Sequence, residues 1–106
     1  MNQRELAELD LAVAKAEGME AVITQDGLCW SRSLGRIYQP TLEDSETLRL
    51  IEKYRLALMP VASGWHGWVC YQPTDPLNDL AAQIFGEGAP TGIAVCRAVV
   101  ALKAAG

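Results

Sequence analysis

The sequence LDLAVAKAEG, residues 9–18, carries the clearest helix signal in this chain. Its apolar positions lie on one helical face with Leu6, and Gly18 is typical of the position just beyond a helix C-terminus. Asn2 followed by Glu5 resembles a capping box at the other end. These features predict a helix over residues 3–17.

A second helix-forming segment, APTGIAVCRA, covers residues 89–98. Thr91 is suited to cap its N-terminus, and we expect the helix to continue to about residue 104. The helix is apolar on nearly all sides. That pattern is typical of a helix that packs against a sheet on one side and against another helix or subunit on the other.

The segment between these helices begins with a predicted hairpin over residues 21–30. Its strands, residues 21–24 and 28–30, flank Asp26-Gly27, a pair that supplies the positive φ angles of tight hairpin turns. Residues 31–43 show no period and predict an irregular connection. A helix then begins at Asp44 or Ser45. The residues expected on its buried face are Thr47, Leu50, Ile51 and Tyr54.

Two more strands are predicted over residues 56–61 and 65–71, the first at an edge or a bulge because it contains Pro60. Residues 76–85 fit a short helix ending at Gly86, although residues 82–85 also fit an edge strand. Hairpins joined by helices predict an α+β fold: an antiparallel sheet of about four strands covered by the N- and C-terminal helices.

Length and composition predict one domain over residues 1–106. The net charge is −4 and the nine Lys and Arg residues are scattered, which argues against a nucleic-acid partner. No apolar run approaches the ~20 residues of a membrane span, so we expect no membrane partner. The three cysteines form no CxxC pair and no signal peptide precedes them, so a reduced, cytoplasmic protein is expected.

Four segments resemble, in the same order, the NinX-type proteins of temperate bacteriophages, a family of unknown function. They are residues 9–18, Tyr38-Gln39-Pro40-Thr41, Leu50-Ile51-Glu52-Lys53, and the segment from Gly88 to Arg97. A related group, the phage alpha-beta-alpha sandwich proteins, ends in a helix similar to residues 93–98. The resemblance implies phage or prophage origin and a location in the bacterial cytoplasm, and it brings no catalytic residues.

The sequence gives little support to a catalytic or metal site. His66 is the only histidine, and no nucleophile motif accompanies it. His66 and Cys70 would lie ~13 Å apart along a strand, whereas zinc ligands lie ~2.0–2.3 Å from the metal. We therefore expect no catalytic residue, no metal and no cofactor.

The binding candidates are aromatic residues and one cation. Trp65 and Trp68 would face opposite sides of a strand, so one is expected in the core and the other outside. Arg97 is the sole charge between Glu87 and Lys103, and it needs a carboxylate, a carbonyl or solvent. The aromatic residues that offer a recognition surface are Trp30, Trp65, Trp68, Tyr38, Tyr54 and Tyr71.

These observations predict a non-enzymatic phage accessory protein that binds a host or phage protein through Trp65, Trp68, Arg97 or Tyr38. A homodimer formed through the last helix, an exposed tryptophan or both is a further expectation. The alternative is a small-molecule-binding or minor enzymatic domain with a pocket near the aromatic strand, which a deep enclosed cavity with convergent polar groups would favour.

Overall fold

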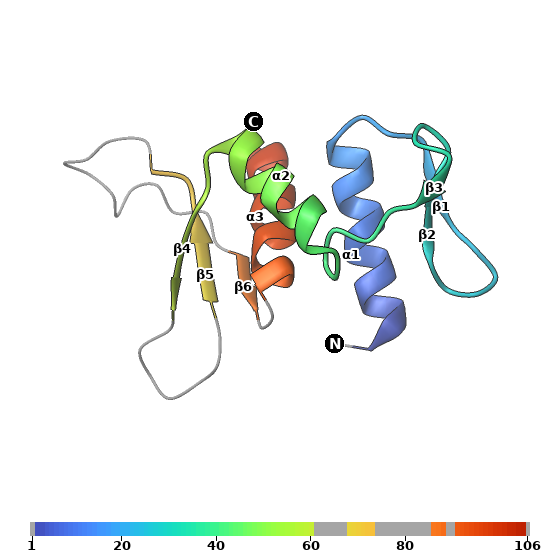
Figure 1. The fold of residues 1–106 in the computed structure, drawn as a ribbon, viewed down its shortest axis with the longest axis horizontal. Coiled ribbons are helices and arrows are strands. Elements are labelled where there is room, and N and C mark those ends of the chain that lie inside the picture. The colour runs from blue at the N-terminus through green and yellow to red at the C-terminus, as the bar shows by residue number, and fades with distance from the viewer. Residues whose placement is uncertain (1, 61–67, 74–85, 89–90, 106) are drawn as a thin grey trace.

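Helices and strands follow a repeated order along the chain (Figure 1). The computed structural model describes residues 2–60, 68–73, 86–88 and 91–105. A helix followed by three antiparallel strands occurs twice, and a last helix closes the chain. The α+β class predicted from the sequence is confirmed. The elements are α1 (Gln3–Ala16), β1 (Ala21–Ile23), β2 (Cys29–Ser31), β3 (Arg36–Ile37), α2 (Asp44–Tyr54), β4 (Ala57–Pro60), β5 (Trp68–Tyr71), β6 (Gly86–Gly88) and α3 (Thr91–Ala105).

The described strands form two antiparallel sheets, so the prediction of one sheet of about four strands is wrong. Sheet A has the order β1-β2-β3 and sheet B the order β4-β5-β6. Each predicted hairpin recruits a third strand from the segment that follows it, β3 in sheet A and β6 in sheet B. The two sheets do not join because helices lie between them (Figure 1).

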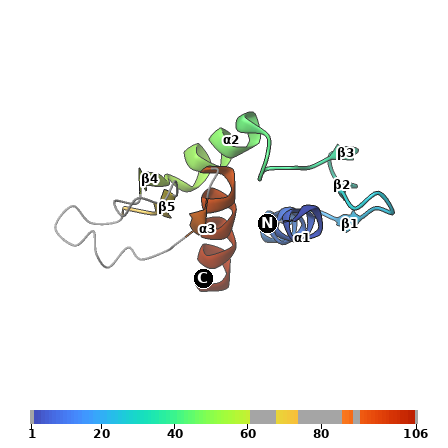
Figure 2. The ribbon, with the colours of Figure 1, turned by 90° about the horizontal axis from the view of Figure 1, so that it is seen from below.

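The sheets are outer layers and the terminal helices are inner layers (Figure 2). Helix α1 packs on β1 and β2, α3 packs on β5 and β6, and α1 and α3 contact each other. Helix α2 contacts α3 as well. Each terminal helix therefore covers a sheet of its own, whereas one sheet covered by both helices was expected. Each of these helices also helps to bury the other.

The central place of α3 explains its composition. It contacts two other helices and sheet B, and its residues 92–96, 98 and 99 are buried. The expectation that one side of this helix remains bare for a dimer is therefore not supported. The chain itself covers most of the apolar surface on which that expectation relied.

One buried cluster draws side chains from all three helices and from both sheets. Cys29, Cys70 and Cys96 belong to it as free, fully buried thiols, so the cysteines pack as small apolar residues. Burial raises the pKa of Cys29 to about 11 and that of Cys70 to about 12. These thiols therefore carry no nucleophilic thiolate at neutral pH.

Local signals match the structure in α1 and in the first hairpin, and they differ at the start of α2. Asn2 Oδ1 accepts from Glu5 N at 2.8 Å, which completes the capping box. The predicted cap of α2 is wrong, since Glu43 is the N-cap residue and makes no side-chain cap bond. The predicted hairpin of β1 and β2 is confirmed: Thr24 N donates to Leu28 O at 2.8 Å and Gly27 has φ 78°, although Asp26 does not have the positive φ that was expected of it.

Candidate functional site

The outer face of sheet A, the face opposite α1, presents a row of apolar side chains. Val22 pairs with Trp30 and Trp30 pairs with Ile37, so the three side chains lie side by side across three strands. Val22 is 41% exposed and Trp30 is 37% exposed. Within the part of the chain that the structure describes, no element covers this row, and Figure 2 shows sheet A at one edge of the molecule.

The alternation along β2 sets this orientation. Cys29 and Ser31 are fully buried on the side of α1, which turns Trp30 between them outward. Ser31 Oγ accepts from Leu34 N at 3.1 Å and so fixes the turn into β3. Tyr38 N donates to Cys29 O at 2.9 Å just beyond β3, which extends the pairing with β2. Strand β3 therefore carries Ile37 next to Trp30.

A charged cluster connects the end of α1 to α2. The Glu17 side chain is 2% exposed and accepts from Arg49 Nη1 at 3.0 Å and from Lys53 Nζ at 2.8 Å. The Tyr54 hydroxyl donates to the same carboxylate. Burial alone would raise the pKa of Glu17, but these three donors outweigh it and hold the pKa below its usual value. Glu17 is therefore ionised at neutral pH.

The second carboxylate of the charged cluster is Glu46, which joins α2 to sheet A. Glu46 accepts from Arg36 Nη2 at 2.7 Å and from Arg49 Nε at 3.0 Å. These bonds outweigh the effect of burial and lower the pKa of Glu46. Arg49 also donates through Nη2 to Tyr38 Oη at 3.1 Å. The charged cluster thus satisfies its own charges, and its described geometry is that of a structural clamp.

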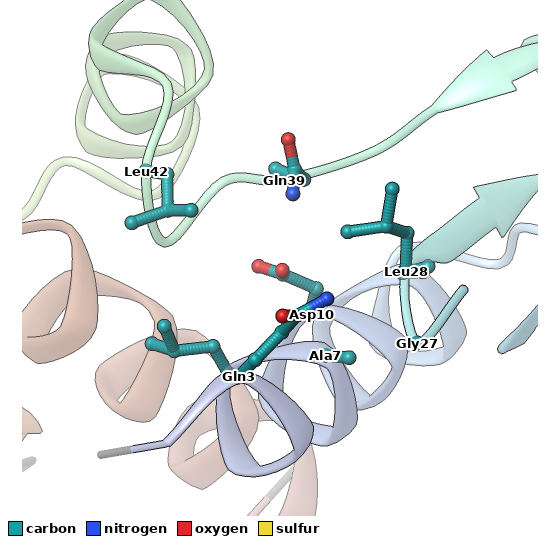
Figure 3. Close-up of a pocket in the computed structure, with 9 residues that line it drawn as sticks. Gln3, Ala7, Asp10, Gly27, Leu28, Gln39 and Leu42 are labelled. Carbon is teal, nitrogen blue, oxygen red and sulfur yellow. The ribbon is translucent and has the colours of Figure 1, made fainter.

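Asp10 is a buried carboxylate where α1, β2, α3 and residues 39–43 meet. It is 2% exposed and accepts from Thr41 N at 3.0 Å. Burial raises the pKa of Asp10 to about 6, although the bond from Thr41 opposes this. Figure 3 shows the carboxylate pointing from α1 toward the segment that carries Gln39 and Leu42. The adjoining cavity has a volume of about 20 Å³, which is room for one water molecule.

The structure does not gather the predicted site residues into one exposed surface. Tyr38 is fully buried and belongs to the core, where it supports Arg49. Trp68 is half-buried on β5 and packs against the core. Arg97 is exposed on α3. Trp65, with the predicted helix or strand over residues 76–85, lies outside the described residues.

Sequence reasoning counted Trp30 among several aromatic residues but did not single it out, and it missed Val22 and Ile37. The strand alternation of residues 29–31 was a usable signal, because a tryptophan between two small residues faces away from them. Glu17 and Asp10 carried no such signal, since their partners are distant in sequence.

Within residues 2–60, 68–73, 86–88 and 91–105, no group of three or more His, Cys, Asp or Glu side chains is placed to hold a metal ion. Among the same residues, no helix has both the length and the apolar character needed to cross a membrane. Comparison with protein-family models and with curated protein sequences finds no match to this chain.

Proposed function

We propose that this chain acts by binding another protein, and that the outer face of sheet A is the surface it uses. The observation that carries this proposal is the row of Val22, Trp30 and Ile37, in which Val22 and Trp30 are exposed and Ile37 is half-buried. A contiguous apolar row on a small domain costs free energy in water, and its burial by a partner gains roughly 25 cal/mol per Å². Tryptophan is also among the residues most often found as interface hot spots.

The biological setting is proposed from the sequence resemblance to NinX-type proteins. It favours a phage- or prophage-encoded accessory protein in the cytoplasm of a bacterial host, with a host or phage protein as partner. A second copy of this chain is also a possible partner. Because α3 is covered within the chain, a homodimer would use the outer face of sheet A instead of the last helix.

The first prediction concerns Trp30. The change Trp30→Thr removes the aromatic surface and keeps a residue that suits a strand, so the fold is retained and binding is weakened at least tenfold. Leu48→Gln is the matched control, because Leu48 is a 55% exposed apolar residue that belongs to α2 and not to sheet A. Each protein is immobilised and exposed to extract from phage-infected host cells, and the retained protein is purified and titrated by calorimetry.

A partner that binds the wild type and Leu48→Gln equally well, but binds Trp30→Thr weakly, supports the proposal. Light scattering of the same three proteins over a tenfold concentration range tests the second copy as the partner. A partner or dimer that survives Trp30→Thr unchanged contradicts the proposed surface.

The alternative, a small-molecule pocket near the aromatic strand, stays a prediction because residues 61–67 lie outside the described part of the chain. The cavities described elsewhere do not favour it. The one beside Asp10 has room for about one water molecule. A larger hollow of about 510 Å³ lies between α1 and the β1–β2 connection, among exposed side chains such as Arg4, Gln25 and Asp26.

A further inference from the structure

The Asp10 carboxylate holds together elements that are distant in sequence. Its Oδ1 atom accepts from the backbone N–H of Thr41, 31 residues along the chain. The opposite side of Thr41 lies against α3: a Cβ atom added at Gly92 would overlap the Thr41 carbonyl group. The backbone of Thr41 is therefore in contact with a carboxylate on α1 through its N–H and with α3 through its carbonyl group.

The groups that face Asp10 do not balance a negative charge. Cys29 on β2 and Cys96 on α3 are neutral thiols near it, and each has its pKa raised by burial first and by the Asp10 charge second. Glu43, just before α2, is another anion that acts on Asp10. No cation forms an ion pair with Asp10 in the described ranges.

The Thr41 hydroxyl is a second buried polar group whose hydrogen bonding is incomplete within the described part of the chain. It is close enough to the Asp10 carboxyl to lower its pKa, yet Oγ1 makes no hydrogen bond of normal geometry within the described part of the chain. A carboxylic acid in this place would remove the buried charge. A carboxylate instead needs further donors, and the adjoining cavity has room for about one water molecule.

We infer that Asp10 is a proton-operated latch, which holds residues 39–43 against α1 and α3 when its carboxyl group is neutral and loosens them when it is charged. The charged form is fully hydrated only if this segment moves away, because the described residues offer it the Thr41 N–H, the nearby Thr41 hydroxyl and a cavity with room for about one water molecule. The raised pKa of Asp10, about 6, places the change between neutral and mildly acidic conditions. The latch operates whether or not sheet A binds a partner.

Amide hydrogen exchange of the whole ¹⁵N-labelled protein, followed by NMR between pH 5 and pH 7.5, tests the latch. Once intrinsic exchange rates are divided out, the protection factor of the Thr41 amide is expected to fall by up to about tenfold as the pH rises across this range. In Asp10→Asn, whose amide oxygen keeps the acceptor for Thr41 N and carries no charge, the protection factor stays constant. Glu8→Gln, an exposed carboxylate on the same helix, behaves as the wild type does.

The Leu50 amide inside α2 is the reference for global opening. Equal changes in the protection of Thr41 and Leu50 would mean that the whole fold loosens, which overturns the latch. The ¹³C signal of the Asp10 carboxyl is expected to titrate near pH 6, and higher in Thr41→Val, which loses the hydroxyl but keeps the backbone donor. A midpoint near the usual 3.8 would also overturn the inference, and this readout does not depend on Asp10→Asn folding.

Discussion

Two buried carboxylates, Asp10 in α1 and Glu17 at the C-terminal cap of α1, show how the surroundings of a carboxylate decide its pKa. Glu17 has cationic and hydroxyl donors that outweigh its desolvation, so its pKa is lowered. Among the described residues, Asp10 has the backbone N–H and the nearby hydroxyl of Thr41 as donors and Glu43 as an anion nearby, so desolvation dominates and the pKa of Asp10 is raised. Burial alone therefore does not decide the charge of a carboxylate in this protein; the number of donors that reach it does.

Glu17→Gln is expected to lower the free energy of unfolding by about 1–3 kcal/mol at pH 7. The amide keeps the size of the side chain but loses the charge that Arg49 and Lys53 bind. Arg49 is itself partly exposed, which keeps the loss below that of a fully buried ion pair. Urea denaturation measures the change. Glu52→Gln, on the exposed side of α2, is the control and should lie within about 0.5 kcal/mol of the wild type.

At the scale of elements, the parts with strong local signals were predictable. The capping box and apolar face placed α1, and the i, i+3, i+4, i+7 pattern placed α2, where Thr47 and Leu50 are buried as expected. Strand β3, Arg36–Ile37, was missed because two residues show no alternation. Strand β6 begins at Gly86, the residue at which a short helix was expected to end. The sequence signals of this segment were ambiguous.

The C-terminus of α2 contains a strained residue that supports a prediction. Arg55 has φ 52°, the left-handed conformation that favours glycine, whereas α1 ends before Gly18 with φ 77°. Arg55→Gly is expected to raise the free energy of unfolding by about 0.5–1 kcal/mol because it relieves this strain. Arg55→Ala, which removes the same side chain without relieving the strain, separates backbone strain from charge. Equal stability of the two variants in urea would contradict the prediction.

At the scale of the whole molecule, the α+β fold class was predictable from the sequence, but the arrangement of two separate sheets on either side of the helices was not. The hairpins were visible in the sequence, but their grouping into two sheets depends on which segments pack against α1 and α3. The all-round apolar character of α3 fits either a helix buried within one chain or a helix at a dimer interface. The structure shows the first, since α1, α2 and sheet B surround it. The candidate site was predictable to the same extent. Trp30 could be recognised in the sequence as a candidate, but its neighbours in the apolar row come from two other strands, whose pairing the sequence did not show.

The whole molecule is expected to be most stable in mild acid, near pH 4.5. Glu17 and Glu46 have lowered pKa values, so their contribution is full above the ordinary value of 4.5 and is lost as the pH falls below it. The contribution of Asp10 to stability changes with pH in the opposite direction. Its pKa rises from 3.8 to about 6 on folding, so the folded state binds the proton more tightly and stability falls as the pH rises through this interval.

A shift of about two pH units at Asp10 corresponds to at most about 3 kcal/mol between pH 4 and pH 7, reduced wherever water reaches the carboxylate. Urea denaturation at constant ionic strength from pH 3 to pH 8 measures the profile. In Asp10→Asn, the fall in the free energy of unfolding between pH 5 and pH 7 should disappear, while the loss of stability below pH 4.5 remains. In Glu17→Gln, the loss of stability below pH 4.5 should become shallower, while the fall above pH 5 remains. A wild-type maximum at pH 7 or higher would contradict the prediction, because the buried charge of Asp10 would then cost the folded state nothing.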